Sequence, residues 1–193
     1  EFSVEDLRVG VFHANTFTSG AAHGGKTTVS ASAAGVTGKT SLAVIYTRRF
    51  LAAGIPPEAA TGLEQAKESA GLAPTLAYPP DQAMIPPNLL IMEFQWRAVP
   101  GTTLFEVALR NDGTDVRLYT KCTTKIGADG CGYTPDAATW KEIVKAFKGS
   151  DPAKVTVRGA DQNALAQAGT SASRDPGRRG GGRRTVGRRC GEL

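Results

Sequence analysis

Alternation of apolar and polar side chains in the second half of the chain predicts short β-strands. Four segments carry this pattern: Leu89–Trp96, Thr103–Arg110, Val116–Cys122 and Lys154–Arg158. In the first segment Met92, Phe94 and Trp96 share one face, as expected for a half-buried strand. The Pro-Gly step at residues 100–101 predicts a hairpin between the first two segments.

One helix is predicted in the same region. In AATWKEIVKAF, residues 137–147, large apolar side chains recur at helical spacing, beginning with Trp140 and Ile143. A turn at Asn111-Asp112-Gly113 separates the second and third predicted strands. Strands therefore outnumber helices, and the pattern excludes the long alternating helices of a three-layer α/β fold.

The first part of the chain is rich in Thr, Ser, Gly and Ala, and its apolar runs are short. The runs Leu7–Phe12, Thr27–Ala31 and Ser41–Phe50 predict strands, and within the last one Leu42–Tyr46 is expected to be well buried. Residues 58–70 have the composition of a short helix. A Pro-rich stretch then runs from residue 71 to residue 88 and has the composition of a linker.

Three zones follow from this pattern. Residues 1–72 are expected to form a small β-rich region with a short helix, residues 73–170 a β-sandwich, and residues 171–193 a disordered Arg/Gly-rich tail. The fold class is therefore mostly β. The expected sandwich lacks its last strand where the tail begins, and an unpaired edge there would invite aggregation.

Composition and charge exclude several kinds of binding partner for the body of the protein. Of the 23 basic and 18 acidic residues, seven Arg and two acids fall in residues 174–193, so the remaining 173 residues carry 16 of each sign. A neutral body gives no electrostatic footprint for nucleic acid or for an anionic membrane. The sequence contains no apolar run long enough to span a membrane. Because it begins at Glu1 without a signal-peptide pattern, we expect a fragment or a processed product.

Cys122 and Cys131 are a candidate disulfide pair. Eight residues separate them, including the turn-forming Asp129-Gly130, which can bring two strands within the ~5.5 Å between Cα atoms that a disulfide requires. Two free thiols are the alternative. The spacing and the lack of a nearby His argue against a zinc site. A disulfide implies an oxidising compartment, and Cys190 has no obvious partner.

A phosphate-binding-loop pattern occurs at Gly20–Thr27 (GAAHGGKT), in which Gly20, Gly25, Lys26 and Thr27 occupy the defining positions. Such a loop needs a strand before it and a helix after it, so that backbone N–H groups surround the phosphates. The following TTVSASAAGVTG is a poor helix. A Gly-rich hairpin loop is therefore the favoured interpretation, and nucleotide binding the alternative.

Nothing else in the sequence predicts catalysis. There is no G-x-S-x-G motif, and the two histidines, His13 and His23, have no adjacent acidic cluster that would complete a metal site. Trp96 and Trp140 are interpreted as packing residues rather than a stacking platform. We therefore expect no enzyme activity, no cofactor and no metal.

The tail, RDPGRRGGGRRTVGRRCGEL, allows two interpretations. It resembles an Arg-Gly-Gly segment that binds RNA through charge and Arg stacking. Alternatively, Arg, Gly and Pro are what GC-rich coding DNA yields out of frame, and a frame slip near residues 171–174 would replace a closing strand with basic coil.

The second half of the chain carries a family resemblance. Trp96, Gly101 and Phe105-Glu106-Val107, followed by Tyr133-Thr134-Pro135 and the Val-x-Val-Arg strand at 155–158, resemble fibronectin type III or immunoglobulin-like modules of bacterial exported envelope proteins and lipoproteins. In some of these proteins such modules precede a TolB-type β-propeller. The resemblance covers about residues 74–161 and implies an antiparallel sandwich.

The resemblance implies a non-catalytic structural or adhesive module. Its expected partners are neighbouring domains of a larger exported protein, together with protein or glycan ligands. Its expected location is periplasmic, attached to the outer membrane, or extracellular. Nucleic acid remains a partner only through the Arg/Gly tail.

Overall fold

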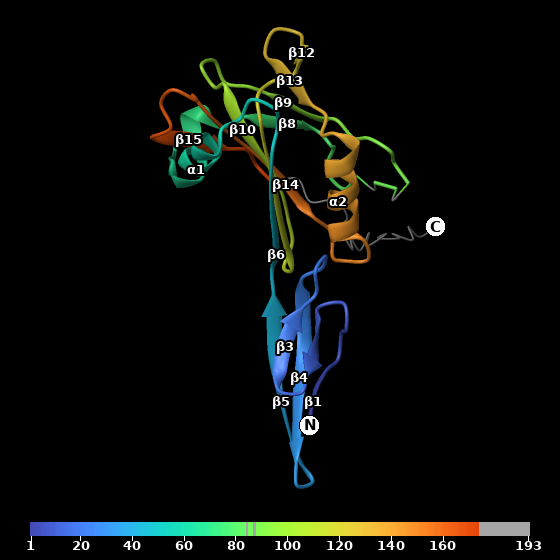
Figure 1. Cartoon of the computed structure of the whole chain (residues 1–193). Helices are drawn as coiled ribbons and strands as arrows, with labels where there is room; N and C mark the ends of the chain where they lie inside the picture. The colour runs from blue at the N-terminus through green and yellow to red at the C-terminus, as the bar shows by residue number, and fades with distance from the viewer. Residues whose placement is uncertain (84, 87, 174–193) are drawn as a thin grey trace, which may run out of the picture.

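The computed structural model describes residues 1–83, 85–86 and 88–173. The protein is mostly β, with 45% of the described residues in strands and 13% in helices. Two packed sheets and two helices form the upper body in Figure 1, and a narrow β-ribbon projects from it. The prediction of a mostly β protein is therefore confirmed.

The smaller sheet of the body has four antiparallel strands in the order β12-β13-β9-β8. Its members are β8 (Thr75–Tyr78), β9 (Phe94–Arg97), β12 (Thr124–Ile126) and β13 (Gly130–Tyr133). The Asp129-Gly130 step lies between β12 and β13, as expected of a turn signal.

The larger sheet has six strands in the order β6-β11-β10-β14-β15-β7. Its members are β6 (Tyr46–Leu51), β7 (Lys67–Glu68), β10 (Leu104–Arg110), β11 (Thr114–Thr120), β14 (Lys154–Ala160) and β15 (Gln167–Thr170). The four central strands are antiparallel, whereas β6 and β7 pair in parallel along the two edges. Residues 46–72 therefore extend from one edge of this sheet to the other.

The main core lies between the two sheets. Apolar side chains alternate along each strand, so one face of each sheet supplies the core. The core side chains from the strands are Leu76, Phe94, Trp96, Phe105, Val107, Leu109, Val116, Leu118, Cys131, Tyr133, Val155 and Val157. Met92, Phe94 and Trp96 are all buried, which confirms the predicted shared face.

Helix α2 (Ala137–Phe147) closes one end of this core. Asp136 caps it, because its carboxylate accepts hydrogen bonds from the backbone N–H groups of Ala138 and Thr139. Trp140 and Ile143 point into the core, and the Trp140 indole donates a 2.7 Å hydrogen bond to the carbonyl oxygen of Leu89. The predicted helix over residues 137–147 is confirmed.

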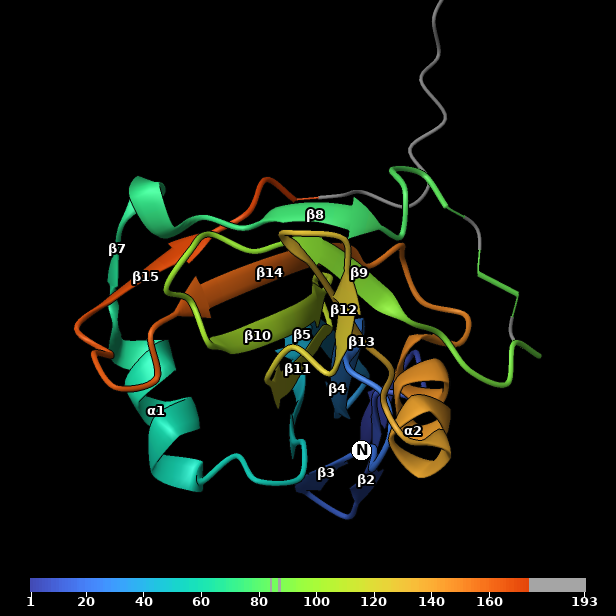
Figure 2. The same ribbon diagram turned by 90° about the horizontal axis from the view of Figure 1, so that it is seen from above.

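Helix α1 (Pro57–Gln65) covers the other face of the larger sheet, opposite the smaller sheet (Figure 2). It starts at Pro57, where a missing N–H costs nothing. Its buried residues Ala59, Ala60 and Leu63 pack on Leu104 and Tyr119 of the sheet. The short 3₁₀ turn η1 (Ala70–Leu72) follows β7.

The ribbon below the body comprises residues 1–44 and is called the N-terminal arm. Its three-stranded sheet has the order β1-β4-β5, formed by β1 (Phe2–Val4), β4 (Gly25–Ala33) and β5 (Val36–Val44). A separate hairpin, β2 (Gly10–His13) and β3 (Thr16–Ser19), accompanies it. Figure 1 shows β4 and β5 extending away from the body.

Two sequence predictions are wrong. The Pro-Gly turn at 100–101 does not close a hairpin: β9 pairs with β8 and β13, whereas β10 pairs with β11 and β14, so the turn carries the chain from one sheet to the other. The segment Leu42–Tyr46 is not well buried, since Ile45 is 64% exposed and Ala43 is exposed as well. An apolar run by itself does not say whether another layer covers it.

The expected boundary at residue 72 does not coincide with a break in the packing. Strands β6 and β7 and helix α1 all precede it, yet they pair with or cover the larger sheet. The expected gap at the last strand is also filled, because β15 pairs with β14 and is itself paired with β7. Residues 174–193, on which both interpretations of the tail depend, lie outside the described residues.

Candidate functional site

The sheet of the N-terminal arm has one apolar face and one polar face. The pairing places Val29 opposite Thr40 and Ala33 opposite Val36, and β1 adds Phe2 beside Ala31. Because side chains alternate, the odd-numbered residues of β4 share this face with the even-numbered residues of β5. The other face carries Lys26, Thr28, Ser30, Ser32, Thr37, Lys39 and Ser41.

The apolar face is covered only near the body. Phe12 of the β2–β3 hairpin stacks on Phe2, with ring centroids 5.4 Å apart, and contacts Phe17 edge to face. Toward the tip no other element of the described residues covers it, and Val36 is 74% exposed. Within the arm only Val9 and Thr27 have buried side chains. The arm therefore has little core of its own, and its exposed apolar face is a candidate interaction surface.

The Gly-rich segment forms the junction between the arm and the body. Gly24 and Gly113 approach backbone to backbone, so a Cβ built on Gly24 would meet the Gly113 carbonyl oxygen at 1.8 Å. The N–H of Tyr46 donates a 2.9 Å hydrogen bond to that same oxygen. Glycine is therefore required here for close packing.

The segment Gly20–Thr27 does not have the strand-loop-helix context that a phosphate-binding loop requires. Gly25, Lys26 and Thr27 begin strand β4, and a strand lacks the free N–H groups that a helix start presents to a phosphate. The Lys26 ammonium forms a 2.9 Å ion pair with Asp112, and the Thr27 hydroxyl accepts a hydrogen bond from the Asp6 N–H. Gly20 lies ahead of the strand, and its N–H donates to the Val9 carbonyl.

A cavity of about 350 Å³ lies at this junction, between the arm, the β10–β11 turn and the segment after α2. Three basic residues line the cavity, Arg8, Lys26 and Lys148. Three acidic residues also line it, Asp6, Asp112 and Asp151. Arg8 and Asp6 are paired at 2.8 Å, and Arg8 hydrogen bonds together with its charge lower the pKa of Asp6 to about 2. The mixed charge gives no preference for an anion.

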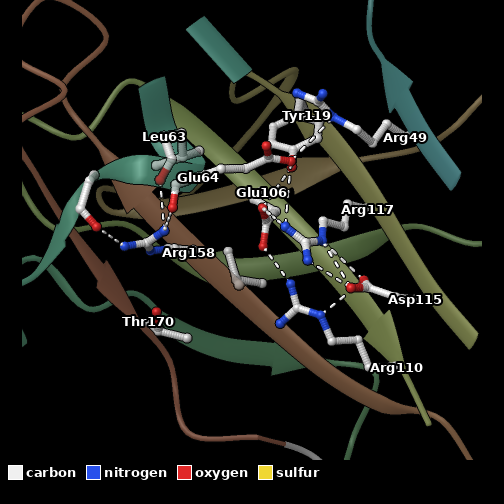
Figure 3. A network of polar contacts seen from close by, with 12 residues as sticks. Arg49, Leu63, Glu64, Glu106, Arg110, Asp115, Arg117, Tyr119, Arg158 and Thr170 are labelled. Atoms are coloured by element: carbon white, nitrogen blue, oxygen red, sulfur yellow. Dashed lines mark hydrogen bonds and ion pairs between the residues drawn. The ribbon is translucent and has the colours of Figure 1, made fainter. Parts of the chain in front are cut away.

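A second polar cluster lies beneath α1, on the outer face of the larger sheet (Figure 3). Its centre is the Tyr119 hydroxyl, which lies 2.8 Å from Glu106 Oε2 and also within hydrogen-bonding distance of Glu64. A hydroxyl has one proton, so it donates to one carboxylate at a time. Glu106 is 4% exposed, and Tyr119 is fully buried.

Arginines from the surrounding strands balance these carboxylates. Arg110 bridges Glu106 at 3.1 Å and Asp115 at 3.0 Å, while Arg117 pairs with Asp115 at 2.7 Å. Arg49 of β6 pairs with Glu64 at 3.2 Å and lies over the Tyr119 ring. The cluster therefore joins α1, β6, β10 and β11 through opposite charges.

The pKa directions follow from this arrangement. Burial, and then the neighbouring carboxylates of Glu64 and Glu106, raises the pKa of the Tyr119 hydroxyl above its usual range. Burial acts to raise the pKa of Asp115, but hydrogen bonds from Arg117 and Arg110 outweigh it and lower that pKa. The shifts favour a neutral Tyr119 hydroxyl and an ionised Asp115 carboxylate, which suits a structural role.

Arg158 fastens the end of α1 to the sheet. Its guanidinium donates a 2.7 Å hydrogen bond to the Leu63 carbonyl and a further bond to the Ala66 carbonyl, two acceptors left open at a helix C-terminus. Its Nε lies 3.6 Å from Glu68 of β7. Arg158 therefore ties the end of α1 and the edge strand β7 to the centre of the larger sheet.

The two cysteines singled out by the sequence lie together. Their Cα atoms are 5.2 Å apart, a separation that a disulfide spans. Cys122 follows β11 of the larger sheet and Cys131 belongs to β13 of the smaller one, so the pair joins the two sheets. Cys190 lies outside the described residues.

The remaining candidates are accounted for by packing. Trp96 and Trp140 are 1% and 3% exposed, so neither offers a stacking surface. Over the described ranges, no three His, Cys, Asp or Glu side chains come together as metal ligands would. His23 lines the junction cavity, and His13 lies at the end of β2.

Sequence reasoning missed two features. The polar cluster combines Glu106 and Arg110 of one strand with Glu64, which lies over 40 residues earlier, and only the fold brings them together. The amphipathic arm had a signal, namely the alternation of apolar and polar residues in TVSASA and in most of VTGKTSLAV.

Comparison with family models, with curated proteins and with solved structures finds no match.

Proposed function

We propose that residues 75–170 form an immunoglobulin or fibronectin type III-like sandwich. The strand order supports this: β8-β9-β13-β12 corresponds to strands A-B-E-D of such a fold, and β11-β10-β14-β15 to strands C′-C-F-G. Helix α2 then occupies the connection between strands E and F. Residues 46–72 are an addition that pairs with both edges of the second sheet.

The sandwich serves as a non-catalytic structural or adhesive module of an exported bacterial protein, presenting the N-terminal arm to a protein or glycan partner. The single observation that carries this function is the apolar face of the arm, which is exposed around Val36 while its base is anchored to the body. Exposed apolar surface on a projecting element is typical of an interaction site. The buried polar cluster holds α1 in place and needs no ligand.

Export is supported by the pairing of Cys122 with Cys131, because disulfides persist in oxidising compartments. None of the helices in the described part of the chain is long and apolar enough to cross a membrane. Neighbouring domains of a larger protein are the expected covalent context.

The test is site-specific photocrosslinking in the periplasm of a bacterial host. A benzophenone amino acid at Val36 samples the apolar face, and the same group at Ser32 samples the polar face of the neighbouring strand. Cosedimentation with purified peptidoglycan, for the wild type and for Val36→Asp, tests the glycan. Crosslinks from Val36 but not from Ser32, or sedimentation that Val36→Asp abolishes, support the function. Absence of both results contradicts it.

A further inference from the structure

The outer edge of β5 offers a row of unpaired backbone groups. Strand β5 ends the sheet order β1-β4-β5, spans nine residues and contains no proline, which makes it the longest edge strand among the described residues. Short edges, prolines, bulges and charged side chains are the usual protection against edge pairing, and of these β5 carries only Lys39. We propose that a second copy of this chain pairs antiparallel along β5, around a two-fold axis at Thr40.

The hydrogen bonds of β4 establish which groups of β5 are free. The Ser32 N–H bonds to the Glu1 carbonyl, and the Thr28 carbonyl accepts from Glu5, so even-numbered residues of β4 bond toward β1. Odd-numbered residues of β4 then bond toward β5, to its residues 36, 38, 40 and 42. On β5 the N–H and C=O groups of Thr37, Lys39, Ser41 and Ala43 consequently point outward.

A two-fold axis at Thr40 brings these outward groups into register. Thr37 then lies opposite the second copy's Ala43, and Lys39 opposite the second copy's Ser41. Each such pair exchanges two backbone hydrogen bonds. Lys39 is the only charged residue of β5 and faces a neutral serine, so no like charges lie directly opposite each other.

The side chains on the apolar face are complementary in size in the same register. Gly38 has open space where a Cβ would be, and the second copy's Leu42 lies opposite it. Val36, 74% exposed at the tip, lies opposite the second copy's Val44. The paired arms form one six-stranded sheet with a continuous apolar face. This fit of β5 to itself favours a second copy over an unrelated strand.

The inference rests on the proposed function, because it names a second copy of this chain as the protein partner of the N-terminal arm. Three outcomes are expected in the full chain carrying Cys190→Ser. First, the protein sediments as a dimer. Second, Thr40→Cys forms a disulfide between two copies under mild oxidation, because opposed residues of a non-hydrogen-bonded pair lie close together. Third, the exposed Ser32→Cys on β4 forms none.

Two further experiments test the register of the pairing and the edge at which it occurs. Chains with Lys39→Cys are expected to crosslink to chains with Ser41→Cys in preference to themselves. Ser41→Pro removes an outward N–H and spares the bonds to β4, so dimerisation is expected to weaken about tenfold or more while the melting temperature of the body is retained.

The opposite results overturn the inference. A chain that stays monomeric at every concentration does so, as does a dimer in which Thr40→Cys fails to crosslink or that Ser41→Pro leaves intact. A monomer whose Val36 photoprobe captures another protein overturns the second copy but keeps the proposed function. A monomer with no crosslink from Val36 and no peptidoglycan sedimentation overturns both.

Discussion

Gly24 and Gly113 lie backbone against backbone where the N-terminal arm meets the sandwich. A Cβ on Gly113 would lie 2.6 Å from the carbonyl carbon of Gly24, and one on Gly24 would lie 1.8 Å from the Gly113 oxygen. Neither contact can be relieved by a side-chain rotation, because the atoms belong to the backbone. The arm is therefore held by a contact that only glycine permits.

Gly24→Ala is expected to destabilise the junction by about 1–3 kcal/mol, the usual cost of overpacking. Thermal unfolding measures the change. Displacement of the arm would also break the Lys26–Asp112 ion pair between arm and body, and the loosened arm should be cleaved faster by a protease. Gly71→Ala is the matched control, since its added Cβ meets open space and it lies outside the arm. Equal melting temperatures for the two variants would contradict the close approach.

The polar cluster beneath α1 should depend on the charge of Glu106. Glu106→Gln keeps the shape of a 4% exposed side chain but leaves Arg110 and Arg117 with less compensating charge, so a loss of about 1–3 kcal/mol in unfolding free energy is expected. Urea unfolding gives this value. Glu5→Gln, at an exposed position in the arm, should cost close to nothing, and a similar loss in both variants would argue against the cluster.

Acid stability should reflect Asp115. Its pKa in the folded protein is lowered, because the hydrogen bonds from Arg117 and Arg110 outweigh burial. The unfolded chain, with an Asp pKa of about 3.9, takes up the proton first as the pH falls. The stabilisation is therefore complete above that pKa and is lost as the pH falls through the folded value.

Melting temperatures measured from neutral to acid pH provide the test. Asp115→Asn should be less stable than the wild type near neutral pH and should show a shallower decline in acid. Asp129→Asn, in the exposed β12–β13 turn, is the control and should keep the wild-type profile. If the melting temperature of Asp115→Asn fell with acid as steeply as that of the wild type, Asp115 would not be the source of the acid sensitivity.

At alkaline pH the same reasoning applies to Tyr119 with the opposite sign. Its pKa is raised in the folded protein, so the unfolded chain loses the phenolic proton first, near pH 10. Stability should be present below that pH and decline above it. Tyr119→Phe removes the ionisation and should flatten this decline in the melting temperature, whereas Tyr78→Phe, at a 42% exposed position, should leave it unchanged.

The Cys122–Cys131 pair should contribute about 2–3 kcal/mol through loop closure. In a Cys190→Ser background, dithiothreitol is expected to lower the melting temperature of the chain that keeps both cysteines. The double variant Cys122→Ser/Cys131→Ser should melt at the lower temperature and should not respond to reductant. A melting temperature that dithiothreitol leaves unchanged in both proteins would mean that the crosslink does not form.

Local patterns were sufficient to predict part of the body, namely strands β10, β11 and β14 and helix α2. They did not predict β8, which lies in the stretch expected to be a linker, or β15, the last strand, which was expected to be missing. Asp136 and the spacing of Trp140 and Ile143 determine α2 within one stretch of chain, and Asn111-Asp112-Gly113 determines the β10–β11 turn. The alternation in Leu104–Arg110 separates Phe105, which enters the core, from Glu106, which faces α1. In each case the signal lies within one short stretch of the chain, so the local pattern is enough to predict the element or the face.

The mostly β class, the strand faces, helix α2 and the neutral charge of the body were thus determined by the sequence itself. Which strands are neighbours was decided only by the tertiary structure: β9 joins β13 and not β10, and β6 and β7 cross the expected boundary to pair with β11 and β15. The pairing of an edge strand and the burial of a side chain depend on which segments from distant parts of the chain pack against them. The same reason explains why Leu42–Tyr46 reads as a core strand yet lies exposed, and why Lys26 meets Asp112 instead of a phosphate.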